Sequence, residues 1–163
     1  MQIKEVFSPP QIIGVQKLAN QIWNECYPAI ITQEQVDYML ETLQTAKAIL
    51  QQIQEGYIYF LLIEDEKNIG YMSMKEMQNS LFLSKLYIHK DARQQGRAKG
   101  AILFLKDYAK KAGLSSIFLT VNKHNEIAIK TYENFSFIRT GSLIQNIGNG
   151  FIMDDFRYEL PLK

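Results

Sequence analysis

A strand that runs into a glycine turn and then into a helix is the feature that most limits how this chain can fold. Residues 81–88 form an apolar run, the turn Arg93-Gln94-Gln95-Gly96-Arg97-Ala98 follows, and a helical pattern spans about residues 95–112. The first N–H groups of a helix have no partner within the helix, and the helix dipole makes that end partly positive. The small residues Gly96 and Ala98 let a ligand approach the backbone closely. The sequence therefore predicts that this turn holds a phosphorylated ligand.

Three cationic side chains, those of Arg93, Arg97 and Lys99, add positive charge at the same turn. A Walker A loop would end in Gly-Lys-Ser/Thr, and a dinucleotide loop would need three glycines spaced G-x-G-x-x-G. Residues 96–100 match neither pattern. Two alternatives stay open: a phosphate-binding domain of another kind, or a glycine that merely eases a turn between solvated arginines.

The spacing of apolar residues predicts an ordered series of helices and strands along the whole chain. Helices are expected at residues 11–26, 32–54, 95–112 and 125–135, with a possible break near Gln44 and Thr45. Strands are expected at residues 2–7, 57–63, 69–77, 81–89, 115–121, 137–145 and 151–160. This mixture indicates one α+β or α/β domain, residues 1–163, built on a single central sheet.

Composition excludes several classes of protein. Hydrophobic residues make up 47% of the 163 residues, which is enough for a core, and the formal charge of +1 gives no general attraction to nucleic acid or to an anionic membrane. The single cysteine, Cys26, excludes a disulfide framework. No stretch approaches the roughly 18–20 apolar residues that a membrane span needs. We expect a cytoplasmic protein whose partners are neither nucleic acid nor a membrane.

A second motif lies in the predicted helix at residues 125–135. Asn125 stands where an N-cap is wanted, and Tyr132 follows seven residues later. That spacing is two helical turns, so the two side chains lie on nearly the same face, about 10 Å apart. Both could contact one extended ligand. The alternative is that Tyr132 packs in the core with Ile127 and Phe135.

Taken together, the two stretches resemble the GNAT superfamily of acyl-CoA-dependent N-acyltransferases. The family signature Arg/Gln-x-x-Gly-x-Gly/Ala matches Arg93-Gln94-Gln95-Gly96-Arg97-Ala98, and the preceding Lys85-Leu86-Tyr87-Ile88-His89 resembles the strand that contacts the cofactor. The later pattern Asn-x-x-Ala-x-x-x-Tyr matches Asn125, Ala128 and Tyr132. Where the family usually has Gly-Phe, this chain has Ser136-Phe137, a departure that affects a turn and not the chemistry. The resemblance covers about residues 81–137.

The resemblance implies a GNAT-like fold of the three-layer α/β type. Its central sheet is mixed and mostly antiparallel, with about six to seven strands flanked by four helices. Residues 115–121 would splay away from the neighbouring strand to admit acetyl-CoA, the implied cosubstrate. The implied cofactor-binding residues are Leu86, Tyr87, Ile88, Arg93, Gln94, Gln95, Gly96, Arg97, Ala98, Lys99, Asn125 and Tyr132.

The implied reaction transfers an acetyl group from acetyl-CoA to a primary amine of a small molecule or peptide, by direct attack in a ternary complex. The Ile88 N–H would stabilise the developing oxyanion, and Tyr132 would act as general acid toward the leaving thiolate. The amine must first lose a proton, and the sequence does not place the base. The candidates are Glu25, Glu76, His89 and Asp154.

The acceptor site is less well marked. Tyr27, beside Pro28, is the aromatic residue of the N-terminal region that we expect to line a pocket. Asp154, with its neighbour Asp155, could form an anionic lip that attracts a cationic amine. The alternative for Asp154 is a solvated hairpin edge. No metal is expected, because the two histidines lack ligand spacing. A homodimer is possible, and the alternative function is a non-catalytic CoA-binding module for sensing or regulation.

Overall fold

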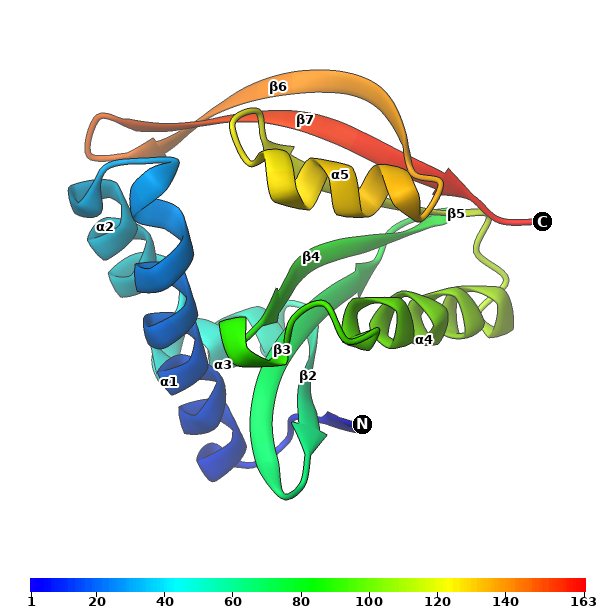
Figure 1. Ribbon diagram of the computed structural model, residues 1–163, viewed down its shortest axis with the longest axis horizontal. Helices are drawn as coiled ribbons and strands as arrows, with labels where there is room; N and C mark the ends of the chain where they lie inside the picture. Colours follow the sequence, from blue (N-terminus) through cyan, green and yellow to red (C-terminus); the bar gives the residue numbers. More distant parts are fainter. The chain divides into compact units, whose positions relative to one another are not determined.

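The computed structural model describes residues 1–163, which form seven strands and five α-helices (Figure 1). The strands are β1 (Gln2–Glu5), β2 (Ile58–Glu64), β3 (Lys67–Glu76), β4 (Ser80–Ile88), β5 (Ser116–Asn122), β6 (Ile138–Gly148) and β7 (Phe151–Pro161). The helices are α1 (Pro9–Cys26), α2 (Gln33–Leu43), α3 (Ala46–Gln54), α4 (Arg97–Lys111) and α5 (Glu126–Asn134). Two short 3-10 helices, η1 (Tyr27–Ala29) and η2 (Lys90–Ala92), complete the series.

All seven strands belong to one sheet, in the order β1-β2-β3-β4-β5-β7-β6. Strand β4 pairs in parallel with β5 through residues 80–82, whereas the pairs β1–β2, β2–β3, β5–β7 and β6–β7 are antiparallel. The predicted fold class, with its mixed and mostly antiparallel sheet, is confirmed. The chain forms two compact units, Met1–Lys75 with Leu83–Ala101, and Glu76–Phe82 with Ile102–Lys163.

In the first unit, α1 packs against α2 and α3 (Figure 1). Helix α1 begins at Pro9, two residues before the predicted start, because Ser8 caps it. The Ser8 hydroxyl accepts from the Gln11 N–H at 3.4 Å, and the Gln11 side chain accepts from the Ser8 N–H at 2.9 Å. The buried side of α1 carries the apolar residues that the helical spacing predicted: Ile12, Val15, Leu18, Ala19, Ile22 and Trp23.

The predicted helical region at residues 32–54 is two helices, so the chain has five α-helices where four were expected. The break falls at Gln44 and Thr45, where a break was considered. Thr45 caps the new helix, accepting from the Ala48 N–H at 3.1 Å. The Gln44 side chain is fully buried, donates to the Tyr59 hydroxyl at 3.2 Å and accepts from the Tyr71 hydroxyl at 2.7 Å. These contacts hold the chain out of helical conformation at this point.

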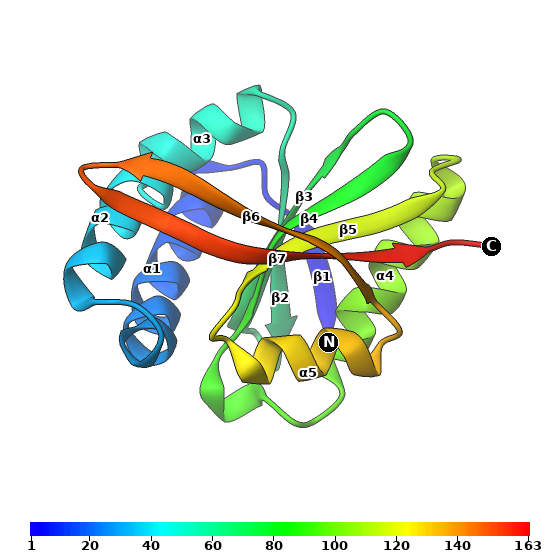
Figure 2. The same ribbon diagram turned by 90° about the horizontal axis from the view of Figure 1, so that it is seen from above.

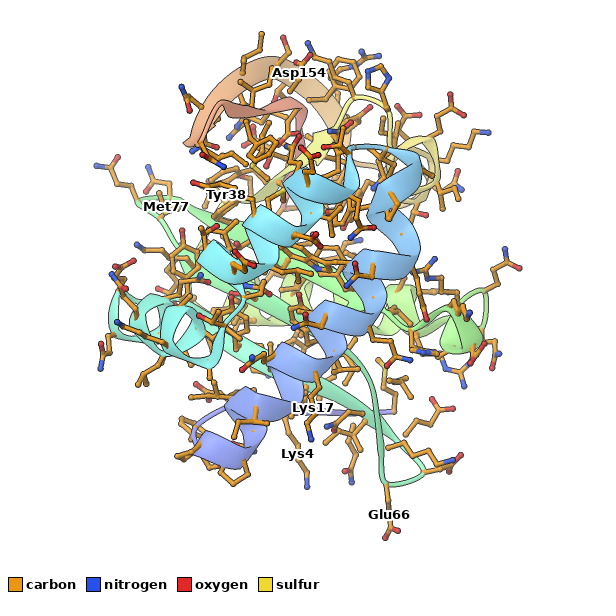
Figure 3. The ribbon with its side chains drawn as sticks, turned by 90° about the vertical axis from the view of Figure 1, so that its left-hand side faces the viewer. Lys4, Lys17, Tyr38, Glu66, Met77 and Asp154 are labelled. Atoms are coloured by element: carbon orange, nitrogen blue, oxygen red, sulfur yellow. The ribbon has the colours of Figure 1, made fainter.

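Strands β2 and β3 form the expected hairpin. Its tip is made by Asp65 and Glu66, whose φ angles are 49° and 62°, and Figure 3 shows Glu66 projecting from this tip. Two successive residues with positive φ are typical of the tight turns that match the twist of a hairpin. Farther along β3, Gly70 leaves room for β4. A Cβ atom on Gly70 would lie 2.4 Å from the Tyr87 carbonyl oxygen and 3.1 Å from the Ile88 Cα atom.

The second unit is built on β5, β6 and β7. Figure 2 shows β6 and β7 side by side as a long hairpin. Alternate residues of β5 and β7 are buried, which is the period-two pattern of a strand with one core face: Ile117, Leu119, Val121, Tyr158 and Leu160. The Tyr158 hydroxyl donates to the Glu133 carboxylate at 2.8 Å and so joins α5 to β7. None of the helices combines the length and apolar character that crossing a bilayer requires.

Candidate active site

The loop between β4 and α4 has the backbone geometry of an anion cradle. Gln94 and Gly96 have positive φ angles of 60° and 80°, and α4 begins at Arg97. A Cβ atom on Gly96 would meet no atom within 4 Å, so the space beside this turn is open. A glycine reaches such a φ angle without strain, and here it also lets a ligand come close to the backbone.

Several consecutive N–H groups of this loop have no backbone acceptor. The Arg93 N–H donates to the Lys90 carbonyl at 3.3 Å, and the next backbone bond is from the Gly100 N–H to the Gly96 carbonyl at 3.1 Å. Between them, the N–H groups of residues 94–99 donate to no carbonyl of the chain. The helix dipole of α4 adds partial positive charge at the same place. A loop of this kind can bind a phosphate group, which is the role that the sequence predicts for it.

Arg93 turns its side chain toward the protein. Its Nε donates to the Ile88 carbonyl at 2.9 Å, and its Nη2 lies 2.7 Å from Cys26 Sγ. The guanidinium thus joins the end of β4 to the end of α1. Sequence reasoning placed Arg93 at the loop but could not show this contact.

Arg97 is also engaged within its own unit. Its guanidinium forms a two-bond ion pair with the Glu64 carboxylate, with Nε 3.0 Å from Oε2 and Nη2 bonded to Oε1. The hydrogen bonds from Arg97 lower the pKa of Glu64. The pair fastens the first residue of α4 to the last residue of β2. Lys99 is exposed and forms no ion pair, so it is the cation of this loop that is available to a ligand.

Three residues that were predicted to contact the cofactor lie at the end of β4: Leu86, Tyr87 and Ile88. The His89 N–H donates to the Ile69 carbonyl at 2.7 Å, so this backbone position faces β3. Because backbone groups alternate along an antiparallel strand, the N–H and carbonyl of Ile88 point away from β3. The Arg93 guanidinium donates to the Ile88 carbonyl on the side of β4 that faces away from β3.

An aromatic cluster joins the predicted acceptor residue to β4. The hydroxyls of Tyr27 and Tyr87 are 2.6 Å apart. The rings of Trp23 and Tyr71 lie close to Tyr87, with centroid distances of 5.4 Å and 5.5 Å. Burial raises the pKa of Tyr71 well above its ordinary value, so this phenol stays neutral. The structure therefore brings Tyr27 against the strand that was predicted to contact acetyl-CoA.

The second unit holds the other predicted residues. Asn125 caps α5, its Oδ1 accepting from the Ala128 N–H at 3.2 Å, as its position in the sequence indicated. Tyr132 lies two turns farther on the same helix and is half-buried. Its ring packs edge-on against Phe137, with centroids 5.5 Å apart. Ile127, one of the core partners considered for Tyr132, is 77% exposed.

Two neighbouring carboxyl groups on β7 differ in their surroundings. Asp154, labelled in Figure 3, forms an ion pair with Lys123, with Oδ1 2.8 Å from Nζ. This cation offsets the negative charge that the proposed anionic lip would need. Asp155 is buried, and its pKa is raised to about 6. Burial is the larger cause and the negative charge of Asp154 the smaller one, while a hydrogen bond from Thr120 acts in the opposite direction. Sequence reasoning counted Asp155 with Asp154 in the anionic lip but named only Asp154 as a candidate base. The available signal was a second acidic residue next to Phe156 in the last predicted strand.

The remaining base candidates all have other contacts. Glu25 pairs with Lys90 at 3.8 Å, and the Glu76 carboxylate accepts from the Tyr108 hydroxyl at 2.6 Å. His89 caps η2 and lies 2.7 Å from the Gln21 side chain. These contacts give each of the three residues a structural role.

The sequence of residues 17–137 matches the profile of the acetyltransferase (GNAT) family. The match covers most of the chain, which therefore belongs to the GNAT family of acetyltransferases, and the resemblance found in the sequence is confirmed. The family takes its acetyl group from acetyl-CoA, so the predicted cosubstrate is confirmed as well. Among curated protein sequences, none matches this chain.

Solved structures of acetyltransferases share the fold. The PaiA N-acetyltransferase of Thermoplasma acidophilum, in complex with coenzyme A, is 18% identical over 99% of both chains, with a TM-score of 0.79. A GCN5-related N-acetyltransferase from Rhodopseudomonas palustris is 11% identical over 99% of this chain and 95% of its own, with a TM-score of 0.82. An N-acetyltransferase from Staphylococcus aureus is 18% identical over 99% and 98%, with a TM-score of 0.73. At these identities the likeness establishes the fold.

Proposed function

We propose that this acetyltransferase transfers the acetyl group of acetyl-CoA to a primary amine of a small molecule or peptide, by direct attack within a ternary complex. The observation that carries the proposal is the run of N–H groups at residues 94–99 that no carbonyl of the chain accepts. Such a run at a helix start suits a pyrophosphate. Membership of the GNAT family favours coenzyme A over other phosphorylated ligands.

Binding is proposed to use backbone groups of the loop and of β4. The N–H groups from Gln94 to Lys99 hold the pyrophosphate, and the exposed ammonium of Lys99 adds charge. The backbone of residues 86–88 pairs with the amide-bearing pantetheine arm as an added strand would, and Asn125 donates a hydrogen bond to the same arm. The predicted divergence of β5 from β4 would make room for this arm.

Acetyl-CoA supplies a thioester whose carbonyl carbon an amine can attack. The Ile88 N–H donates to the carbonyl oxygen as negative charge develops there. The contact from Arg93 to the Ile88 carbonyl holds the backbone of that residue in place. The Tyr132 hydroxyl donates its proton to the departing sulfur, and the proton that the attacking nitrogen loses on forming the amide restores the hydroxyl.

The amine must be neutral to attack, and Asp155 is the carboxyl that we propose to test as the acceptor of its proton. This carboxyl is buried and its pKa is about 6, so it is ionised at neutral pH and can accept a proton. A general base is most effective when its pKa lies near the working pH. The other acidic candidates are engaged in the contacts described above.

The test is acetyl-CoA turnover against a panel of primary amines, followed with a reagent that detects the released thiol. Calorimetric titration with acetyl-CoA and with NAD measures the cofactor preference separately. Acetyl-CoA binding together with amine-dependent thiol release is the expected result. Tight acetyl-CoA binding with no acetylation of any amine would instead favour the sensing or regulatory module. Binding of NAD in place of acetyl-CoA would refute the cofactor assignment.

Two further expectations stay predictions. The cytoplasmic location rests on cysteine usage, and the homodimer rests on the open edges of the sheet. Sedimentation velocity of the purified chain distinguishes a dimer from a monomer.

A further inference from the structure

Lys85, near the middle of β4, is a half-buried cation surrounded by neutral groups. Its Nζ lies 3.2 Å from Ser84 Oγ and 3.5 Å from Gln52 Oε1, and 5.7 Å from the centre of the Tyr59 ring. No carboxylate pairs with it. Gln52 and Ser84 could be satisfied by a neutral side chain, so the local packing does not explain a lysine here.

A second unpaired lysine lies close by. The Lys75 ammonium is 4.9 Å from the centre of the Tyr57 ring, and the Lys85 ammonium is 6.0 Å from the same ring. Lys75 is half-buried and also lacks a carboxylate partner. Burial, and to a smaller extent the nearby Glu55 carboxylate, raises the pKa of Tyr57. Glu55 forms an ion pair with neither lysine. Two ammonium groups therefore share one aromatic ring without a counter-ion.

Keeping an unneutralised cation away from water is unfavourable. Burial lowers the pKa of Lys85 to about 8, in the direction that this penalty requires. A carboxylate bound between the two lysines would remove the penalty and form charge-assisted hydrogen bonds. The pair is thus arranged to take an anion from outside the chain.

The position of the lysines on β4 and its neighbour β3 indicates what carries that anion. Lys85 and Tyr87 are two residues apart on one strand, so they share a face and lie about 7 Å apart. Tyr87 contacts Tyr27, the predicted acceptor residue, and the next residue, Ile88, is the proposed oxyanion donor. An acceptor with its amine near Ile88 would extend along this face toward the lysines.

We propose that Lys85 and Lys75, flanking Tyr57 on the face of β4 that carries Tyr87, bind a carboxylate of the acceptor. The acceptor class is therefore an amine that also carries a carboxylate at its far end. This inference rests on the proposed acetyltransferase function and names the substrate class of that same site.

The experiment compares matched acceptors with the full chain. The probes are β-alanine, 4-aminobutyrate and 5-aminopentanoate, each against its own carboxamide, which removes the negative charge and keeps the amine. We expect the best acid to exceed its amide in kcat/KM by about 10-fold or more, which is the usual size of a charge-assisted contact. Lys85→Gln should bring that ratio close to 1 through KM, and Lys85→Arg should keep most of it.

Two controls make the outcome specific. Lys17→Gln removes a lysine from the exposed side of α1, labelled in Figure 3, and should leave the ratio unchanged. Calorimetric binding of acetyl-CoA confirms that each variant is folded, and Lys75→Gln provides the same test if Lys85→Gln does not fold. Equal turnover of acids and amides, unaffected by either lysine variant, would overturn the inference and leave the acetyltransferase function standing. Absence of turnover with every amine would overturn both.

Discussion

Replacing Asp155 by asparagine should stabilise the protein at neutral pH. The Asp155 carboxyl is 7% exposed, and its pKa is raised from 3.8 to about 6. The folded protein therefore holds this proton up to a higher pH than the unfolded chain does, and stability falls as the pH rises from about 4 to 6. A shift of about 2 units corresponds to at most about 3 kcal/mol, all of it lost by pH 8. An asparagine side chain is uncharged at every pH, so the variant Asp155→Asn should avoid that loss.

The assay is urea unfolding of both proteins at pH 4 and pH 8. Trp23 is the single tryptophan and is 1% exposed, so its fluorescence reports unfolding. Asp155→Asn should gain up to about 3 kcal/mol at pH 8 and close to nothing at pH 4. The control, Asp154→Asn, removes a partly exposed partner of Lys123 and also the smaller of the two causes of the raised Asp155 pKa. It should therefore change the stability at pH 8 by at most about 1 kcal/mol in either direction. An equal change at both pH values, or a loss of stability at pH 8, would refute the reasoning.

The same variant separates a catalytic carboxyl from a structural one. If Asp155 accepts the proton of the amine, the asparagine variant should be more stable and yet slower, by about 100-fold or more in kcat. The kcat/KM of the wild-type protein should rise with pH through about 6, and the variant should lose that rise. A stabilised variant with unchanged kcat would show that Asp155 takes no part in the reaction. It would still support the conclusion that the buried, ionised carboxylate destabilises the folded protein.

Three further substitutions test the assigned roles. Tyr132→Phe keeps the ring and removes the proton donor, so kcat should fall about 100-fold while acetyl-CoA affinity by calorimetry stays within about twofold; unchanged turnover would contradict the role. Arg93→Ala removes the hydrogen bond to the Ile88 carbonyl and should lower kcat more than it lowers acetyl-CoA affinity. Arg93→Gln should restore part of kcat. If the alanine variant loses only acetyl-CoA affinity, and that loss depends on salt, Arg93 instead binds phosphate. Glu64→Gln loosens the Arg97 anchor and should raise the acetyl-CoA Kd a few-fold; an unchanged Kd would separate the pair from binding.

Much of the fold follows from periodicity in the sequence. The buried side of α1 could be predicted because six apolar side chains recur at helical spacing, from Ile12 to Trp23. The β2–β3 hairpin was marked by a polar stretch between two apolar runs, and the backbone of Asp65 and Glu66 makes its turn. The division of α2 from α3 was harder to predict, because it depends on Gln44 meeting two tyrosines from β2 and β3.

The site was only partly predictable, because motifs report backbone and not side-chain direction. The pattern around Gly96 located the loop, since the signature depends on a small residue at a left-handed turn. Nothing local indicates that the Arg93 guanidinium turns back to Ile88, a contact made by folding. Asp155 occupies a strand position whose alternation suggests an outward face, so its burial depends on tertiary packing. Lys85 alternates with the buried Leu81 and Leu83, so the sequence suggests an inward face but does not show which groups surround its ammonium.

The close approach of β3 and β4 at Gly70 also limits which sequence positions of this protein tolerate substitution. Gly70 contributes no side chain to any proposed step, yet a single methyl group there would collide with the Tyr87 carbonyl oxygen. A library scored by activity should therefore show as little tolerance at position 70 as at a residue that touches the reactants. Substitutions intended to change the acceptor should therefore be better tolerated at the side chains of β4 than at Gly70 on β3.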